Sequence, residues 1–363
     1  VAGSRYGGRS YPFFGPEDFH HRDGDALGNC VVKNYADAHE VQFCDLMEMP
    51  DLCTECDHVQ EMFASYLRRL ADLGVAGIRV DAAKHIEPSA LGSLLARVGR
   101  KLHVMQEVQQ GMQGVRASSY VSFGRVTEFD YSKQLEKSIL DEAHLKRLRK
   151  LGEALGFVPS GSAVVFLDNH DTQRSQEGNR ARLTHRTPSL YTLAAVFMLA
   201  HPYGFPQLMS SFAFKSYDQG PPHEAVHGPS GLLRCGQSGP WVCEHRWPVI
   251  TNMVAWRKIA GNASISLIHA VDMDTLVICR GDVACAVVHR GKGKAKALEL
   301  QLPLAPGAYC DVARSDSTDC PLVRVREGGL ARLEVPPVGA VAFHAGARRS
   351  EAASFLGMPV RRH

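Results

Sequence analysis

The 363-residue sequence contains no internal repeat, no low-complexity segment and no apolar run long enough to cross a membrane. Its longest apolar run, residues 193–200, is far shorter than the roughly 20 residues that a transmembrane helix needs. The formal net charge is only +3, so there is no charge-based reason to expect a nucleic-acid partner. Local basic runs such as residues 147–150 are expected to face solvent. With 45% apolar and 22% charged residues, the sequence predicts an ordinary globular protein.

The first two thirds of the chain alternate between two kinds of periodicity. Residues 1 to about 55 show no clear period and predict an irregular loop domain. Strand-like runs then follow at about 77–81, 102–107, 125–130, 163–168 and 203–210. Helical spacing appears at 57–72, 89–99, 132–152, 188–199 and 248–259. This alternation predicts parallel βα units.

The pattern changes after about residue 262. Short strand-like runs separated by Gly and Pro turns occur at 275–279, 284–288, 297–300, 322–325 and 340–344. No helix is expected between them, so this part predicts a small antiparallel sandwich. The tail from Arg348 onward is predicted to be disordered.

Three of the apolar strands end in acidic residues. In the segment GIRVDAAKH, residues 77–85, the alternation of a strand puts Arg79 and Asp81 on one face. The guanidinium should lower the pKa of Asp81 and keep it ionised, whereas partial desolvation should raise the pKa of Glu107. A third strand leads to His170 and Asp171. One such acid is more often a helix cap or an ion-pair partner, but several together are typical of barrel enzymes.

These segments also resemble a known family. GIRVDAAKH, QEV at 106–108 and FLDNHD at 166–171 are similar to three short conserved regions of the α-amylase family of glycoside hydrolases. GRVTEFDY, FMLAHPYGF, WVCEHRW and GAYCDV resemble animal-type α-amylases in the same order, over roughly residues 10 to 345.

The resemblance implies an α/β fold, a partial (β/α)8 TIM barrel with strands 4–8 present. On this interpretation residues 1–55 are a remnant of the loop domain inserted after strand 3, and 56–262 carry the catalytic barrel strands and helices. Residues 263–347 form the C-terminal β-sandwich, and 348–363 the tail. The first three barrel strands are expected to precede Val1.

The implied activity is retaining endo-hydrolysis of α-1,4-glucosidic bonds in starch or glycogen. Such chemistry needs two carboxyl groups, one protonated and one ionised. By resemblance, Asp81 is the nucleophile, Glu107 the acid/base and Asp171 the third acid, which binds and distorts the sugar. Arg79, Lys84, His85 and His170 are the implied substrate-binding residues. His170 and His85 would hydrogen-bond sugar hydroxyls, and Lys84 would lie one subsite along.

The resemblance also implies two ion sites. The Asp51 carboxylate and the backbone carbonyls of Gln42 and His85 match calcium ligands, and calcium prefers such oxygens. Another ligand, an asparagine, would belong to the preceding segment, so the calcium site is incomplete in this chain and weak binding is expected.

For chloride, Arg79 and Asn169 match two ligand positions, but Gln207 stands where animal-type relatives have an arginine. Loss of a cationic ligand makes bound chloride unlikely, and little or no chloride dependence is expected.

The chain has ten cysteines. The resemblance suggests the pairs Cys30–Cys44, Cys235–Cys243 and Cys310–Cys320, and therefore a secreted protein from an oxidising compartment. A cross-hairpin bond between Cys279 and Cys285 is possible. Cys53 and Cys56 form a CxxC, which could be a redox motif, half a zinc site or a structural pair. The absence of a second Cys/His pair at finger-like spacing favours the structural interpretation.

Other clusters carry less information. Residues 19–23 contain His20, His21 and Asp23, which are metal-ligand types, but no second cluster completes a site and a solvated loop is predicted. The segment WVCEHRW, residues 241–247, is predicted to be structural.

A monomer acting on polysaccharide is the leading hypothesis. Within the enzyme class, an α-glucosidase or transglycosylase fits less well, because the animal-type segments favour an α-amylase. A different class is an inactive amylase-like fragment or a non-enzymatic sugar-binding protein, against which the three intact acids count.

Overall fold

The computed structural model describes residues 8–22, 28–109, 111, 114–140, 144–174, 181–236, 239–315, 317 and 319–349. The chain divides into two compact units, the first made of residues 1–129 and 156–164 and the second of residues 130–155 and 165–363. Among the described residues, no helix combines the length and the apolar character needed to span a membrane.

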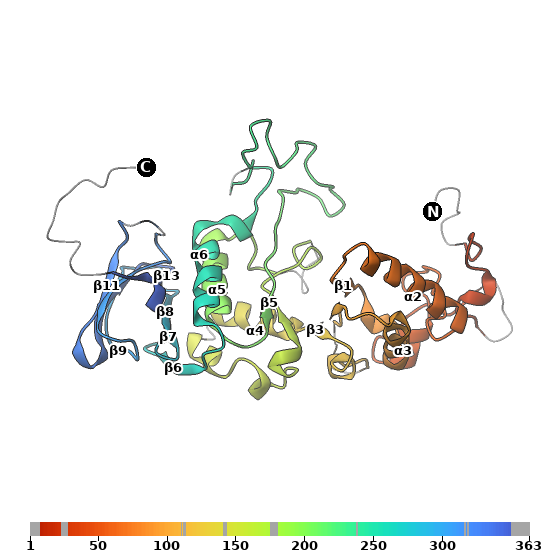
Figure 1. Cartoon of the computed structure of the whole chain (residues 1–363), viewed down its shortest axis with the longest axis horizontal. Coiled ribbons are helices and arrows are strands. Elements are labelled where there is room, and N and C mark those ends of the chain that lie inside the picture. The colour runs from red at the N-terminus through yellow and green to blue at the C-terminus, as the bar shows by residue number, and fades with distance from the viewer. Residues whose placement is uncertain are drawn as a thin grey trace. The chain divides into compact units, whose positions relative to one another are not determined.

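The first unit is built on parallel strands (Figure 1). β1 (Gly77–Val80) pairs with β2 (His103–Gln106), β2 with β3 (Arg125–Thr127), and β3 with β4 (Ala163–Val165). All four strands fall inside their predicted ranges, and the expected parallel βα arrangement is confirmed. The strands bring the ends of β1 and β2, where Asp81 and Glu107 follow, next to each other.

Helices α2 (Asp57–Asp72) and α3 (Pro88–Val98) pack together through a small apolar cluster. Its buried members are Ala64, Leu67, Leu94 and Val98. Helix α3 begins where the Glu87 side chain accepts from the Ala90 amide at 2.9 Å, and it ends at Gly99 in the left-handed conformation.

The region predicted to be irregular contains one helix, α1 (Ala38–Phe43), capped by the Asp37 side chain. Six residues are fewer than two turns, so they carry too little periodicity for sequence to detect. Short 3₁₀ turns complete the first unit: η1 (Pro16–Asp18), η2 (Ala83–His85), η3 (Ala117–Tyr120) and η6 (Ser160–Ser162).

The second unit begins with α4 (Phe129–Leu140), whose first residue lies at the unit boundary. The single helix predicted over 132–152 is wrong, because α4 ends at Leu140 and the 3₁₀ turns η4 (Leu145–Lys150) and η5 (Glu153–Leu155) follow. Leu145 and Leu148 are both buried, and their three-residue spacing puts them on one face of a 3₁₀ turn.

Two further helices, α5 (Pro188–Ala200) and α6 (Pro248–Ala260), pack against each other. Nine residues of α5 are buried, as expected for a helix that is apolar all round. The last strand of the parallel sheet, β5 (Phe205–Pro206), is much shorter than the strand predicted over 203–210. It is fixed beside β4 by the Gln207 amide, which donates to the Val165 carbonyl at 2.8 Å. The turn η7 (Glu244–Arg246) precedes α6.

The C-terminal part is an antiparallel sandwich, as predicted (Figure 1). One sheet has the order β14-β10-β11-β12-β9 and the other β13-β8-β7-β6. Their bounds are β6 (Ile265–Ala270), β7 (Thr275–Arg280), β8 (Ala284–His289), β9 (Lys296–Gln301), β10 (Gly307–Cys310), β11 (Leu322–Val325), β12 (Leu330–Val335), β13 (Gly339–His344) and β14 (Arg348–Arg349), with 3₁₀ turns η8 (Glu327–Gly329) and η9 (Ala345–Ala347). Arg348 and Arg349, predicted to start the tail, instead form β14; residues 350–363 lie outside the described residues.

The sandwich is joined to the helices of its own unit. Helix α6 packs on β13, and the Trp256 indole donates to the Phe343 carbonyl at 3.0 Å. Between the two sheets lies a core that includes Val277, Tyr309 and Phe343.

Five disulfides link the ten cysteines. They are Cys30–Cys44, Cys53–Cys56, Cys235–Cys243, Cys279–Cys285 and Cys310–Cys320. The three expected pairs and the possible cross-hairpin pair are confirmed. Cys279 and Cys285 are direct partners in the register of β7 and β8, which explains their bond.

Candidate active site

Asp81 and Glu107 follow adjacent strands and share one cation. Arg79, near the end of β1, forms an ion pair with Asp81, and its Nη2 lies 3.0 Å from Glu107 Oε2. The Asp81 side chain is 71% exposed, whereas that of Glu107 is 14% exposed. The same-face placement of Arg79 and Asp81 predicted from strand alternation is therefore found, with Glu107 as a second partner of the guanidinium.

Backbone geometry directs a further donor at Glu107. Ala82 follows Asp81 with φ of 45°, a left-handed conformation that is unusual for alanine. In this conformation its amide donates to Glu107 Oε2 at 3.1 Å. The amide of Glu107 itself donates to the Val80 carbonyl at 2.9 Å. The side chain and the backbone of Glu107 are thus both held by the segment of β1 and the residues that follow it.

The pKa of Glu107 is raised above its ordinary value. Burial is the largest cause, and a hydrogen bond to the Asp81 carboxyl together with that group's charge acts in the same direction. The Ala82 amide and Arg79 oppose the shift without cancelling it. Of the two adjacent carboxyl groups, the more buried one therefore holds a proton to higher pH than an ordinary glutamate does.

Lys84 and His85 follow in η2. Burial lowers the pKa of Lys84, whose Nζ lies 5.0 Å from the centre of the Tyr35 ring. Burial also lowers the pKa of His85 and favours the neutral imidazole. His85 Nδ1 donates to the Val41 carbonyl at 2.9 Å, which leaves Nε2 as an acceptor.

The residues expected to bind calcium lie in the same unit. Asp51 is a partly buried carboxylate whose Oδ2 is 2.7 Å from His20 Nδ1, and desolvation raises its pKa. The Gln42 amide donates to the Tyr120 hydroxyl at 3.2 Å, and that hydroxyl donates to the Ile86 carbonyl at 2.7 Å. Tyr120, which sequence did not single out, thereby ties the Gln42 segment to the turn that contains His85.

The prediction of a solvated loop is wrong for His20, which is only 8% exposed. Its ring contacts Asp51 on one side and Glu55 on the other, at 3.0 Å. His20, Cys53 and Glu55 lie close enough to suggest a metal site, but the Cys53 sulfur is in a disulfide and is not a thiolate. Asp23, of the same motif, lies outside the described residues.

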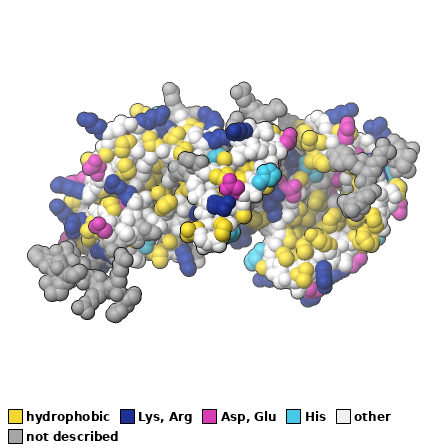
Figure 2. All heavy atoms as spheres, turned by 90° about the horizontal axis from the view of Figure 1, so that it is seen from above, with side chains coloured by type: hydrophobic (Ala, Val, Ile, Leu, Met, Phe, Trp, Pro, Cys, Tyr) yellow, Lys and Arg dark blue, Asp and Glu magenta, His cyan; other side chains and the backbone are white. Residues whose placement is uncertain are grey.

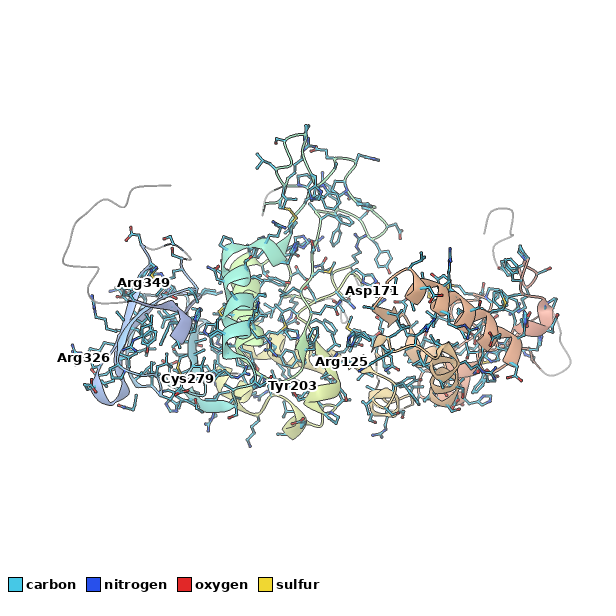
Figure 3. The ribbon with its side chains drawn as sticks, viewed as in Figure 1. Arg125, Asp171, Tyr203, Cys279, Arg326 and Arg349 are labelled. Atoms are coloured by element: carbon cyan, nitrogen blue, oxygen red, sulfur yellow. A yellow bond between two sulfur atoms is a disulfide. The ribbon has the colours of Figure 1, made fainter. Side chains whose placement is uncertain are left out.

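In the second unit, the segment Asn169–Asp171 follows β4. Asn169 Oδ1 accepts from the Asp171 and Thr172 amides at 3.0 and 2.7 Å, which fixes a turn that projects the next side chains outward. His170 Nε2 lies 3.4 Å from Asp171 Oδ2, and both side chains are more than half exposed. Asp171 is labelled in Figure 3. Gln207, the other residue singled out here, is exposed just after β5.

Behind this turn lies a buried polar network that the sequence analysis missed. Gln173 Nε2 donates to Asp168 Oδ2 at 2.6 Å and lies 2.7 Å from the Ser211 hydroxyl. The Ser211 amide donates to Glu244 Oε2 at 2.6 Å, and Glu244 is fully buried. Burial, together with a smaller contribution from the nearby Glu244 charge, raises the pKa of Asp168 to about 7. The structural role predicted for the segment around Glu244 agrees with this network, whose members are too far apart in sequence to form a motif.

Within the units, the structure assembles two groups of predicted residues. Arg79, Asp81 and Glu107 form one group in the first unit, and Asn169, His170 and Asp171 form another in the second. The first group places two carboxyl groups around one guanidinium, an exposed one and a shielded one whose pKa is raised, and cleavage of a glycosidic bond requires a pair of carboxyl groups.

Comparisons with known proteins agree with this chemistry. The family model described as "Alpha amylase, C-terminal all-beta domain" matches residues 268–346. An α-amylase of the scallop Pecten maximus is 35% identical over 97% of this chain and 74% of its own length. Pancreatic α-amylase 2a5 of Mus musculus is also 35% identical, over 83% of this chain and 64% of the mouse protein.

Among solved structures, wild-type α-amylase I of Eisenia fetida superposes with a TM-score of 0.84 at 30% identity. The match covers 92% of this chain and 74% of the earthworm enzyme. A variant of that enzyme, solved in complex with maltohexaose, matches with a TM-score of 0.80 at 29% identity.

Proposed function

Because this chain belongs to the α-amylase family, we propose that it hydrolyses internal α-1,4-glucosidic bonds of starch or glycogen with retention of configuration. The observation that carries the proposal is the Asp81–Arg79–Glu107 arrangement. The two carboxyl groups lie close together, because both contact the same Arg79 guanidinium. That closeness supports a retaining mechanism, since inverting enzymes need room for a water molecule between the two groups.

In this mechanism the Asp81 carboxylate attacks the anomeric carbon. Arg79 keeps it ionised and fixes its orientation. Glu107 donates its proton to the departing glycosidic oxygen, and its raised pKa favours this role because the group keeps its proton to higher pH. The ionised Glu107 then removes a proton from the water that opens the glycosyl-enzyme, and the resting protonation is restored.

The exposed residues of the second group are assigned to sugar binding. Asp171 would hold and distort the reacting sugar, with His170 donating to a hydroxyl from the same turn. Lys84 and the free Nε2 of His85 would contact sugar hydroxyls beside Asp81. The maltohexaose bound by the earthworm variant supports an α-glucan as the ligand class.

Calcium is the ion that the residues fit. The partly buried Asp51 carboxylate has a histidine rather than an arginine or lysine as its close partner, and Tyr120 ties the Gln42 and His85 segments together. The Asp51 carboxylate and the Gln42 and His85 carbonyls would hold the ion, which would stiffen the turn carrying Lys84 and His85. Three oxygens are fewer than the about six to eight that calcium prefers, so weak binding follows.

Chloride is not expected to be a cofactor. At the position implied for its second cationic ligand the chain has Gln207, a neutral side chain. Activity that is the same in chloride and in acetate salts of equal ionic strength is the expected result.

The five disulfides support an extracellular protein, and we assign it there as a monomer. The fraction of the protein found outside the cell tests the first assignment, and the molecular mass of the protein in solution tests the second.

The activity is tested by release of reducing ends from soluble starch with calcium present. Glu107→Gln should lower the rate by about 10²–10⁴-fold, because the proton donor is lost while the shape is kept. Glu61→Gln changes an exposed glutamate on α2 and should leave the rate unchanged. A folded wild-type chain that binds maltooligosaccharides and releases no reducing ends would instead establish the non-enzymatic alternative.

A further inference from the structure

The sheet β14-β10-β11-β12-β9 carries a row of arginines across its strands. In the antiparallel register, Arg349 of β14 and Arg324 of β11 both lie opposite Ala308 of β10. Arg324 in turn lies opposite Arg332 of β12. Directly opposite residues share a face, so Arg349, Arg324 and Arg332 form one line with a small alanine between the first two.

This face is the outer one. Along β11, Val323 and Val325 are buried in the core, whereas Leu322 and Arg324 are exposed. Arg326 continues the exposed side just beyond the strand. In Figure 2, Lys and Arg side chains are more prominent than acidic ones on the visible face of the sandwich, at the left of the view.

The charges in this row are poorly neutralised. Arg332 forms an ion pair with Glu299, but none of the described carboxylates pairs with Arg324, Arg326, Arg348 or Arg349. Arg349 donates to the Cys310 sulfur and the Ser317 carbonyl, and Arg348 to the Pro306 carbonyl, all of which are neutral acceptors. Like charges directly opposite each other destabilise a sheet. The placement of Arg324 opposite Arg332 therefore does not serve the stability of the sheet.

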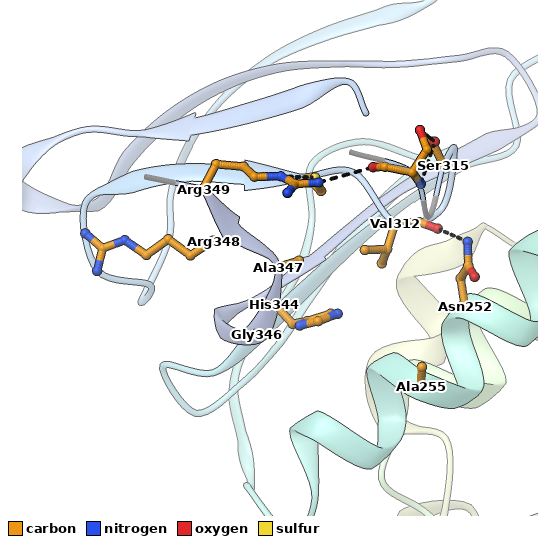
Figure 4. A pocket seen from close by; sticks show the side chains of 11 residues that line it. Asn252, Ala255, Val312, Ser315, His344, Gly346, Ala347, Arg348 and Arg349 are labelled. Atoms are coloured by element: carbon orange, nitrogen blue, oxygen red, sulfur yellow. Dashed lines mark hydrogen bonds between the residues drawn. The ribbon is translucent and has the colours of Figure 1, made fainter. Parts of the chain in front are cut away.

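An open groove of about 820 Å³ lies among these side chains. Its lining includes Arg324, Arg326, Arg348 and Arg349 with a single acid, Glu327. Figure 3 labels Arg326 and Arg349 on this sheet. Figure 4 shows the neighbouring pocket of about 290 Å³, where the Arg349 side chain extends toward the Ser315 turn and the Arg348 side chain extends in the opposite direction.

We propose that this arginine groove is a second binding site, separate from the catalytic residues, for sulfate or phosphate groups carried by a polysaccharide. Each guanidinium presents five N–H donors in a planar fork that matches a tetrahedral oxyanion, and few of these donors are used within the described part of the chain. The spacing of the row suits a linear ligand bearing several charges, because successive strands are about 4.8 Å apart. The choice of a polysaccharide carrier rests on the proposed function.

Dextran sulfate is the first probe, because its α-1,6 backbone makes its binding independent of α-1,4 hydrolysis. Dextran phosphate tests whether the groove binds phosphate groups as well as sulfate groups. Uncharged dextran serves as a control for binding of the sugar backbone, and duplex DNA as a control for general attraction to a polyanion. Arg324→Ser/Arg326→Ser removes two positive charges from the groove. Arg147→Ser/Arg149→Ser removes two exposed arginines from η4, outside the groove, and serves as the matched control.

The groove variant should bind dextran sulfate or dextran phosphate at least about tenfold more weakly than wild type, since hydrogen bonds to charged groups are lost. The control should bind like wild type, and uncharged dextran should not bind at the groove. Both variants should hydrolyse soluble starch at the wild-type rate, which separates failure here from failure of the amylase assignment. Equal weakening in the control, or DNA binding as tight as dextran sulfate, would show general charge attraction and overturn the proposal. No binding of either charged dextran by wild type would also overturn it.

Discussion

At the scale of single residues, Arg79 is the common partner of two carboxyl groups with different tasks. Its guanidinium pairs with the exposed Asp81 and lies 3.0 Å from the shielded Glu107. The difference in burial, more than the shared cation, sets the two groups apart, because burial is the largest cause of the raised pKa of Glu107. One arginine can therefore orient both groups while the pKa of Glu107 stays raised.

Replacing Arg79 should change both the rate and its pH dependence. Arg79→Ala is expected to lower starch hydrolysis by about 10²-fold through misplacement of the two acids. Because Arg79 lowers the pKa of Glu107, its loss should move the alkaline limb of the pH–rate profile to higher pH. Arg68→Ala removes another ion-paired arginine, on α2, and should leave the profile unchanged. An alkaline limb that stays in place would argue against Glu107 as the proton donor.

Asp168 should make the stability of the protein fall as pH rises. Its folded-state pKa is raised to about 7 from its ordinary value of 3.8, so the folded chain holds more protons than the unfolded chain between these values. The stabilisation is complete below the unfolded pKa and is lost as pH rises through the folded pKa. Relative to wild type, Asp168→Asn should therefore gain about 2–4 °C in Tm between pH 5 and pH 8.

Thermal unfolding of both proteins across this range measures the effect. Asp130→Asn, an exposed carboxylate on α4, is a control that should track wild type. Parallel curves for Asp168→Asn and wild type would mean that Asp168 is ionised in the folded state throughout.

At the scale of elements, the close packing of β2 and β3 positions the strand that leads to Glu107. A Cβ atom added to Gly124, just before β3, would lie 2.5 Å from the Val104 carbonyl oxygen of β2. That oxygen belongs to backbone inside a parallel sheet and cannot move cheaply. A glycine is therefore required there by the neighbouring strand.

Gly124→Ala should destabilise the protein by about 1–3 kcal/mol, the usual cost of overpacking. Gly161→Ala is a matched control in the same unit, because nothing lies within 4 Å of the added atom. Denaturant unfolding compares the two. If both substitutions lower the free energy of unfolding equally, then the close approach of β2 to β3 is not the reason that a glycine is needed at position 124.

At the scale of the whole molecule, calcium is expected to act on stability rather than on the chemical step. The residues assigned to it are drawn from α1, the segment before α2 and the turn η2, so one ion would link three stretches of the first unit. A ligand that binds only the folded state raises stability by mass action.

Millimolar calcium should raise the Tm of the wild-type chain by about 2–4 °C, with no such rise in Asp51→Asn. Asp72→Asn, an exposed carboxylate at the end of α2, should respond like wild type. A calcium response that survives in Asp51→Asn would place the ion elsewhere.

The sequence by itself determined the family, the order of the βα units and the acids at the strand ends, because these are properties of short contiguous segments. The ranges of α2, α3, β1 and β2 followed from local periodicity and differ from the structure by about a residue. The catalytic and ion-binding roles assigned to individual residues remain predictions that the experiments above address.

Only the tertiary structure decided what depends on contacts between distant segments. It buried His20 against Asp51 and Glu55, joined Asp168 to Ser211 through Gln173, and set Arg324 opposite Arg332. Strand register, helix ends and burial depend on how elements pack. The energy of packing comes from contacts between segments that are distant in sequence, so no single segment determines it. The pKa of Glu107 shows both contributions, since an acid after an apolar strand is visible in sequence, whereas its hydrogen bonds to Ala82 and Asp81 exist only in the fold.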